Sequence, residues 1–357
     1  MVQGHTEAQL LGLCEKLFCL TENPLVINKH NFYISLSIGI AVFPFGGTNV
    51  TTLLQHADIA MYSAKQKGNN AVCMYDETLS QKITRRLRLE QDLTNVIQNN
   101  ELFLLYQPQV DSKLNKVIGA EALIRWQHPE LGLISPYEFI PIAEETSQII
   151  PIGKWILQEA CRQLKKWHSA GYSHLKMGIN LSAIEFEQKD FVQTIISTIE
   201  EIGIPTSSID LELTERIAMV EEKETLLKLK KLKLYGLHLS MDDFGTGYSS
   251  LAYLSLYPID NLKIPREFVN RVGTSNDGIE TIKTIVALAH ALKMNVIAEG
   301  VETEGQLQVL QSNKCYCIQG YYYSKPLDED EFTNFLMNYS EEISFPKQGD
   351  GLTEDGK

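Results

Sequence analysis

The sequence predicts an α/β protein whose main part is a closed, TIM-like (β/α)8 barrel, preceded by a small α+β segment. Two observations support the barrel. From Glu101 onwards, short β-prone runs alternate with longer helical stretches, which is the order of parallel strands joined by crossover helices. This part has about 250 residues, the usual size of such a barrel. An open doubly wound sheet is the alternative, but it normally has a glycine-rich loop after its first strand, and Tyr106–Val110 (Y-Q-P-Q-V) is no such loop.

The composition is that of a globular protein with one large domain and an appendage. The 357 residues include 45 acidic and 32 basic side chains, for a net charge of −13. This charge argues against binding to a nucleic-acid polymer or to anionic lipid. No apolar run is long enough to form a membrane segment and no secretory signal begins the chain, so we expect a cytoplasmic protein. The six cysteines have neither zinc-ligand spacing nor disulfide-scaffold density, which predicts reduced thiols.

The first 77 residues contain too few elements for a whole domain. Helical spacing over Glu7–Leu20 is followed by a β-prone run, Phe32–Phe43. The next two elements are an amphipathic helix over Thr51–Lys67 and a short strand over Ala71–Tyr75. Residues 78–98 form a polar helix with one apolar stripe, which we interpret as a linker.

The barrel is expected over residues 99–340, and residues 341–357 form a polar tail that we expect to be disordered. Each of the eight strand candidates is a short β-prone run between helical stretches. In chain order they are Phe103–Gln107, Val117–Trp126, Lys176–Leu181, Ile209–Thr214, Leu237–Asp242, Asn261–Ile264, Asn295–Ala298 and Tyr316–Gln319.

Two adjacent carboxylates, Asp242 and Asp243, are placed where a strand ends. Apolar and polar residues alternate from Leu237 to Met241, which predicts a strand that leads directly into the pair. At the end of a strand both side chains can turn towards one opening and share metal ions. An acidic helix N-terminus is the alternative interpretation of the same residues.

A polar residue stands at or near the end of every strand candidate. Buried carboxylates are costly unless they are paired or bind a metal, so several of them on one barrel rim indicate a site rather than a core. Hard oxygen donors without a His or Cys cluster favour Mg²⁺ or Mn²⁺ over zinc. The residues are Gln107, Glu121, Asn180, Glu212, Asp242, Lys263, Glu299 and Gln319.

The segment Glu121–Trp126 (E-A-L-I-R-W) resembles the naming motif of the EAL-type cyclic-di-GMP phosphodiesterases. Further blocks resemble the same family in the same order, from the linker helix to Leu327: Y-Q-P-Q-V, N-L-S, E-L-T-E, D-D-F-G-T-G-Y-S-S, N-L-K-I, A-E-G-V-E and Q-G-Y-Y-Y-S-K-P. The N-terminal stretch S-I-G-I-A-V-F-P with Ala57–Asn70 resembles the C-terminal part of a GGDEF diguanylate cyclase domain. The GGDEF loop itself has no counterpart, so cyclase activity is not expected.

The resemblance implies a role for each matching residue. Two Mg²⁺ or Mn²⁺ ions are implied in each active site, and the first would be held by Glu121, Asn180, Glu212 and Asp242. Asp242 would bridge to the second ion, and Asp243 would complete its site. The catalytic step would use Lys263, Glu299 and Gln319, substrate contacts would come from Gln107 and Arg125, and support would come from Glu215, which anchors the Asp243–Ser250 loop, and from Glu302. The alternatives are ordinary: a cap residue for Asn180, a solvated Lys263 and a structural salt bridge for Arg125.

The implied activity is hydrolysis of cyclic-di-GMP to linear pGpG, in bacterial second-messenger signalling. One departure from the family pattern is Pro265, where K-I-D is usual and this chain has K-I-P. It could be harmless, or it could loosen Lys263 and slow hydrolysis. A catalytically silent cyclic-di-GMP receptor is therefore the alternative function. By analogy with related domains, a homodimer through the EAL-like part is expected.

Overall fold

The computed structural model describes residues 6–68, 70–218, 222–246, 251–272 and 276–342. The predicted tail beyond 342 and the second half of the Asp243–Ser250 loop lie outside these residues. The chain divides into two compact units, Met1–Leu93 and Thr94–Lys357.

The first unit is small and contains two helices, a hairpin, a two-stranded sheet and a final polar helix. The strands β3 and β4 are parallel, and buried Ala60, Ala64 and Cys73 form the core between them and α2. The elements of this unit follow the predicted order with boundaries shifted by a few residues, except that the β1–β2 hairpin was not predicted. They are α1 (Glu7–Cys19), β1 (Leu25–Ile27), β2 (His30–Phe32), β3 (Ser37–Ile40), α2 (Val50–Gln66), β4 (Ala71–Met74) and α3 (Glu77–Leu93).

The second unit contains the predicted barrel. Each of its strands pairs with two neighbours, and the pairing of β5 with β6 and β13 closes the ring. All eight strand candidates are confirmed. They are β5 (Leu102–Asp111), β6 (Lys116–His128), β8 (Lys176–Leu181), β9 (Ile209–Thr214), β10 (His238–Asp242), β11 (Asn261–Ile264), β12 (Asn295–Ala298) and β13 (Cys317–Gln319), with the short strand β7 (Gly132–Ile134) added beside β6.

The first barrel strand departs from the parallel order that the sequence predicts. β5 runs antiparallel to both β6 and β13, whereas the other neighbouring barrel strands are parallel. The cause is the connection to β6, which is a turn over residues 112–115 and far too short for a crossover helix. The Asp111 carboxylate shapes this turn by accepting hydrogen bonds from the backbone N–H groups of Lys113 and Leu114, both at 2.9 Å.

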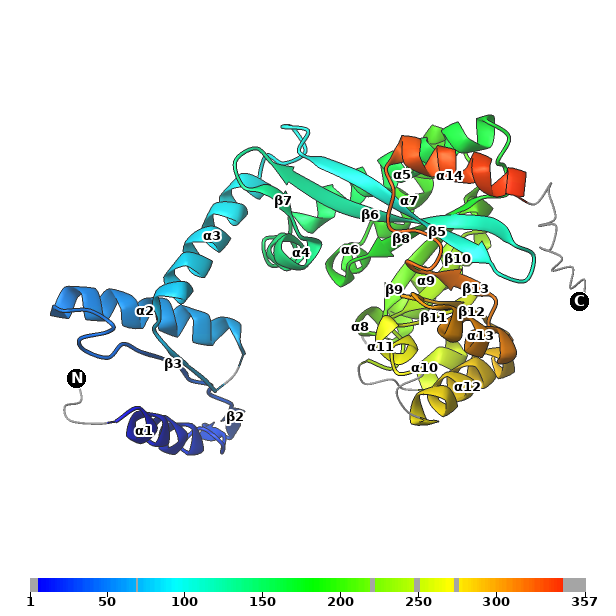
Figure 1. The fold of residues 1–357 in the computed structure, drawn as a ribbon. Helices are drawn as coiled ribbons and strands as arrows, with labels where there is room; N and C mark the ends of the chain where they lie inside the picture. Colours follow the sequence, from blue (N-terminus) through cyan, green and yellow to red (C-terminus); the bar gives the residue numbers. More distant parts are fainter. Residues whose placement is uncertain (1–5, 69, 219–221, 247–250, 273–275, 343–357) are drawn as a thin grey trace, which may run out of the picture. The chain divides into compact units, whose positions relative to one another are not determined.

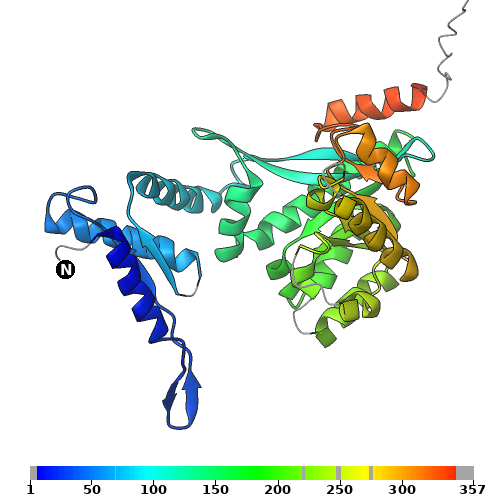
Figure 2. The same ribbon diagram turned by 60° about the horizontal axis from the view of Figure 1, so that its bottom comes forward.

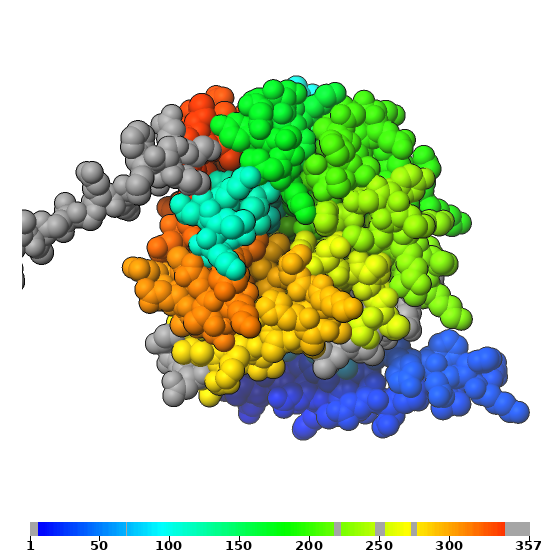
Figure 3. Space-filling model, turned by 90° about the vertical axis from the view of Figure 1, so that its right-hand side faces the viewer, coloured from blue at the N-terminus to red at the C-terminus, as the bar shows by residue number. Residues whose placement is uncertain are grey.

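Helices surround the strands, as Figures 1 and 2 show. In Figure 3 the space-filling surface shows the β5–β6 turn in cyan among helices coloured green to orange. Of these helices, α5 packs on β8, α9 packs on β10, and α12 packs on both β11 and β12. The helices are α4 (Pro136–Glu145), α5 (Ile149–Ser169), α6 (Ala183–Glu187), α7 (Phe191–Ile202), α8 (Glu215–Ala218), α9 (Glu222–Leu234), α10 (Leu251–Leu256), α11 (Arg266–Val269), α12 (Asn276–Ala291), α13 (Glu304–Ser312) and α14 (Glu329–Glu342).

Two composition-based expectations can be compared with the described residues. All six cysteines are free thiols in the structure. Among the described helices, none combines the length and apolar character that a bilayer crossing requires.

Candidate active site

The barrel register places predicted polar residues of neighbouring strands next to one another. Gln107 of β5 lies directly opposite Glu121 of β6, and Asn180 of β8 lies opposite Glu212 of β9. Asp242 is the last residue of β10, as the alternating sequence predicts. Because strand side chains alternate between two faces, this register points one set of polar groups into the barrel opening.

The ammonium group of Lys263 lies at the centre of these side chains. Lys263 is fully buried on β11, and its Nζ lies 2.5 Å from Glu212 Oε2 and 2.6 Å from Glu299 Oε1. Carboxylate oxygens of Glu121 and Asp242 each lie 3.4 Å from the same atom. We call Glu121, Glu212, Asp242 and Glu299 the carboxylate cluster. A lysine so enclosed is not the solvated surface group that was the alternative interpretation.

Amides hold Glu121 in place. Gln319 Nε2 donates to Glu121 Oε2 at 2.5 Å, and Asn180 Nδ2 donates to Oε1 at 2.5 Å. Gln319 also donates to Gln107 Oε1 at 3.2 Å and accepts from Gln109 Nε2 at 3.0 Å. The chain of amides therefore fixes both oxygens of one carboxylate, and Asn180 acts here as a donor rather than as a cap.

The charges of the cluster do not balance without added cations. Burial raises the pKa of Glu212 well above its usual range, and burial together with nearby Asp242 raises that of Glu299 to about 8. For Glu121 burial acts in the same direction, but Lys263, Gln319 and Asn180 outweigh it and lower the pKa. Burial opposes the charge of Lys263, yet the surrounding carboxylates raise its pKa well above normal. Glu212 and Glu299 therefore hold their protons to higher pH than isolated carboxyl groups do when no other cation is bound.

The donor set fits a hard divalent cation by its chemistry. Carboxylate and amide oxygens are the ligands that Mg²⁺ and Mn²⁺ prefer, and Glu212 Oε1 is buried without a hydrogen-bond partner. Within the part of the chain that the structure describes, no three acidic, His or Cys side chains already have metal-holding spacing. Lys263 Nζ lies among the carboxylates, so binding a cation would require them to turn away from it.

Gly178 makes room for the Glu212 carboxylate. It lies on β8 beside Glu121 and Asp210, and a Cβ on it would overlap Glu212 Oε1. Neither Gly178 nor Gln109 was predicted as a site residue. Gln109 could have been found, since two positions after Gln107 it shares the same strand face. The space beside Gly178 is occupied by a side chain of the neighbouring strand. The sequence does not show which residue of that strand lies opposite, so the role of Gly178 could not be predicted.

The second aspartate begins a tightly bent loop. Asp243 has a left-handed φ of 53°, a conformation that Asp tolerates better than most residues, and its N–H donates to Asp242 Oδ1 at 2.9 Å. Burial and the charge of Asp242 raise the pKa of the Asp243 carboxyl. Glu215 accepts from the N–H of Gly245 at 2.8 Å, which is the loop-anchoring contact expected of it.

Two of the predicted residues lie outside the carboxylate cluster. Arg125 is half-buried on β6, on the same strand face as Glu121, and donates to the carbonyl of Ile124 at 2.8 Å. No salt bridge involves Arg125 among the described residues, which removes the structural alternative for it. Glu302 pairs with Arg266 Nη2 at 2.7 Å on the surface, so its place near a metal stays a prediction.

Comparison with known families decides the class of this barrel. Residues 90–326 match the EAL domain, and residues 2–71 match the diguanylate cyclase, GGDEF domain. The chain belongs to the EAL domain family. The GGDEF match corresponds to the small first unit, and the EAL domain contains every predicted site residue.

Two curated relatives are named for cyclic di-GMP chemistry. The chain is 38% identical over 331 residues to the bifunctional diguanylate cyclase/cyclic di-GMP phosphodiesterase MucR of Pseudomonas aeruginosa, covering 93% of this chain and 48% of MucR. It is 33% identical over 339 residues to the cyclic di-GMP phosphodiesterase PdeR of Escherichia coli, covering 95% and 51%. The chain thus spans about half the length of these curated relatives.

Solved structures of EAL proteins share the fold. The phosphodiesterase PaMucR in complex with c-di-GMP is 39% identical, with a TM-score of 0.67, covering 69% of this chain and 99% of that structure. The EAL enzyme Bd1971 in its cAMP and cyclic-di-GMP bound form is 34% identical, with a TM-score of 0.69, covering 81% of this chain and 76% of that structure.

Proposed function

We propose that this chain is a divalent-metal-dependent phosphodiesterase that hydrolyses cyclic-di-GMP to linear pGpG. The observation that supports it most directly is the carboxylate cluster around buried Lys263 at the open end of an EAL barrel. Relatives named as cyclic di-GMP phosphodiesterases and the c-di-GMP complex of PaMucR agree with this substrate. The reaction adds one water across a phosphodiester bond of the ring and releases the ribose 3′ oxygen.

The proposed metal positions use the cluster and its neighbours. Glu121, Asn180, Glu212 and Asp242 would hold one Mg²⁺ or Mn²⁺, and Asp242 with Asp243 would hold a second. Bound there, the cations would supply a hydroxide nucleophile at neutral pH and neutralise phosphate charge.

The remaining residues bind, orient and accept protons. Lys263 places a fixed positive charge beside the opening, where it stabilises charge that develops on the phosphate. Glu299 lies 2.6 Å from Lys263 Nζ, where its carboxylate would accept a proton from the attacking water. Gln319 keeps Glu121 oriented through its 2.5 Å hydrogen bond. Among the described residues no carboxylate pairs with the Arg125 guanidinium, which would bind a substrate phosphate. Gln107, opposite Glu121 on the neighbouring strand, would contribute an amide to the substrate.

Pro265 does not displace the lysine, which supports hydrolysis over silent binding. Lys263 and Ile264 keep their parallel register with Ile297 and Ala298, and Lys263 is fully buried. Pro265 follows the last residue of β11 with φ −63° and precedes α11. A proline is readily tolerated at this junction, because its fixed φ suits the start of a helix.

The deciding experiment is anion-exchange chromatography of cyclic-di-GMP incubated with the protein and Mg²⁺ or Mn²⁺. We expect metal-dependent pGpG that a chelator abolishes and that Glu121→Gln reduces more than about 100-fold. Glu200→Gln, on the exposed face of α7, is the matched control and should leave the rate unchanged. Tight binding of intact cyclic-di-GMP without pGpG would favour the receptor instead.

We also propose that the EAL domain forms a homodimer near the Asp243 loop. Leu256, at the end of the helix that follows this loop, is a 49% exposed apolar side chain. Glu215 links the loop to the end of β9 beside the cluster, so a partner could bias the metal ligands. Monomer and dimer fractions separated by dilution should then hydrolyse substrate at different rates, and equal rates would refute this coupling.

A further inference from the structure

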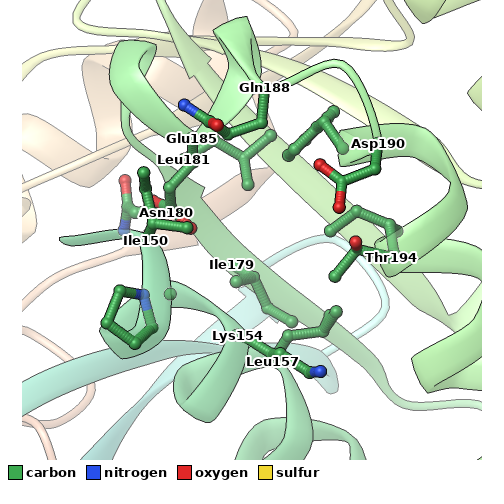
Figure 4. Close-up of a pocket in the computed structure, with 14 residues that line it drawn as sticks. Ile150, Lys154, Leu157, Ile179, Asn180, Leu181, Glu185, Gln188, Asp190 and Thr194 are labelled. Atoms are coloured by element: carbon green, nitrogen blue, oxygen red, sulfur yellow. The ribbon is translucent and has the colours of Figure 1, made fainter. Parts of the chain in front are cut away.

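A second hollow lies outside the barrel wall, on the opposite side of β8 from the carboxylate cluster. It has a volume of about 320 Å³ and lies among β8, α5, α6 and α7. Figure 4 shows Ile179 of β8 between the helix that bears Lys154 and the segment that bears Asp190 and Thr194. Apolar side chains that include Ile179, Leu181 and Leu157 line much of it. A concave, mainly apolar cavity with a few convergent polar groups is typical of a small-molecule site.

Glu185 is the buried polar group of this cavity. The Glu185 residue is 9% exposed, and burial raises the pKa of its carboxyl to about 8, which favours the neutral acid at pH 7. One oxygen, Oε2, accepts from the N–H of Ser182 at 3.1 Å. The other, Oε1, lies directly against the α5 backbone, where a Cβ on Gly153 would overlap it. A neutral carboxyl offers one O–H donor to a ligand.

The charges around the cavity limit which ligand it can take. Its other ionisable lining residues are Lys154 and Asp190, both exposed and of opposite sign. They offset each other at the rim, and the buried end carries no net charge while Glu185 is protonated. A charged group placed in this mostly apolar cavity would lose its hydration, which costs free energy.

The backbone segment from Asn180 to Ser182 connects this cavity with the carboxylate cluster. Ser182 caps α6, and its Oγ donates to Glu144 at 2.7 Å while its N–H donates to Glu185. Two residues earlier on the same segment, Asn180 donates to Glu121 at 2.5 Å. Asn180 also lines the cavity. A group that fixes Glu185 therefore also fixes the strand end that positions a proposed metal ligand.

We propose that this cavity binds a small, uncharged, mostly apolar molecule that accepts a hydrogen bond from Glu185. We further propose that its binding is coupled to the carboxylate cluster through Ser182 and Asn180. The binding site stands independently of the catalytic activity, whereas the coupling rests on the metal site of the proposed function.

Ligand class is tested with three probes of one shape: phenylbutanamide, phenylbutylamine and phenylbutanoate. Titration of the full chain at pH 7 should give saturable binding of the neutral amide with Kd below about 1 mM, a range normal for small ligands. The ammonium and carboxylate probes should bind at least about 10-fold more weakly. Absence of saturable binding would overturn the site, and tighter binding of a charged probe would overturn the ligand class.

The location is tested on α7. Thr194→Phe fills the cavity and should abolish amide binding, whereas Gln193→Phe, the exposed neighbour that does not line it, should leave binding unchanged. Intermolecular nuclear Overhauser contacts between the amide and the methyl groups of Ile179 and Leu181 give a second readout that needs no variant. Equal binding by both variants, or contacts elsewhere, would overturn the location.

The coupling is tested with Mn²⁺ affinity rather than with hydrolysis. Saturating phenylbutanamide should tighten Mn²⁺ binding at least about 5-fold, and Mn²⁺ should tighten amide binding by the same factor, because coupling between two sites is reciprocal. Amide binding with unchanged Mn²⁺ affinity would refute the coupling alone. A chain that binds the amide but no Mn²⁺ would refute the proposed function and leave the cavity assigned.

Discussion

At the scale of single residues, Gly178 controls how closely Glu212 can approach its neighbours. A Cβ at this position would overlap Glu212 Oε1, the buried oxygen that has no hydrogen-bond partner. We expect Gly178→Ala to weaken Mn²⁺ affinity by about 10- to 100-fold, because groups that orient a ligand have effects of this size. Calorimetric titration with Mn²⁺ measures it. Gly305→Ala, where a Cβ meets nothing within 4 Å, is the control, and an equal effect there would contradict the prediction.

The Glu185 carboxyl predicts a pH dependence of stability. Burial raises its pKa to about 8 in the folded protein, whereas an unfolded chain has a value near 4.3. Between these values the folded state binds more protons, so stability falls as pH rises through this window. We expect Glu185→Gln, which cannot ionise, to be more stable than the native chain by on the order of 3 kcal/mol at pH 7 and to lose this advantage near pH 4.

Urea midpoints of the EAL domain at several pH values test this expectation. An advantage of Glu185→Gln that does not change with pH would show that Glu185 ionises normally. Thr198→Val, a buried change on nearby α7 without an ionisable group, provides a reference whose effect should not depend on pH.

Much of the candidate site could be predicted from polar residues at strand ends. Glu212, Asp242 and Lys263 follow from this rule, because a closed barrel brings strand ends together. The rule could not give the arrangement inside the opening. The contact between Lys263 Nζ and Glu299 Oε1 joins side chains from different strands, and only the register of the folded barrel sets that distance.

At the scale of elements, one lysine secures the short helix α6. Lys228 Nζ of α9 donates to the carbonyls of Phe186, Glu187 and Gln188 at 2.8, 3.3 and 3.2 Å. A five-residue helix leaves these groups without partners inside the helix. We expect Lys228→Met to destabilise the EAL domain by about 1–3 kcal/mol, because these carbonyls lose a charged donor.

Chemical denaturation of the variant tests this expectation. Lys166→Met is the matched control, since Lys166 pairs with Glu329 on the exposed surface and should cost less than about 1 kcal/mol. Equal destabilisation by both variants would show that the contacts of Lys228 with the carbonyls add no more stability than an exposed ion pair.

The strands were predictable as elements, but the direction of the first one was not. Alternation of β-prone and helical runs predicts parallel strands, and this prediction is correct for seven of the eight barrel strands. The exception depends on the short turn shaped by Asp111, whose side chain accepts two backbone hydrogen bonds. A strand of ten residues followed so soon by another is the local signal for a hairpin.

At the scale of the whole molecule, the chain divides into two compact units, and the boundary between them in the sequence follows residue 93. The barrel is closed within the second unit, and every predicted site residue lies there. We expect residues 94–357 expressed alone to fold and to retain Mn²⁺-dependent formation of pGpG within about 10-fold of the whole chain. Circular dichroism and the chromatographic assay measure both properties. A folded fragment without activity would show that the first unit is required for catalysis.

Because β5 is antiparallel to its neighbours, the polypeptide enters the barrel at the end where the carboxylate cluster lies. Leu102, which begins β5, pairs with Trp126. Glu101 fastens this entry, since Trp126 Nε1 donates to its carboxylate and Gln127 N–H to its carbonyl, both at 2.8 Å. A force that pulls on the residues before Leu102 would therefore act on β5 first. It would shear the backbone hydrogen bonds that join β5 to β6 and to β13. Tension would reach β5, the strand that carries Gln107, before any other part of the barrel. A force from that direction would therefore act directly on the site.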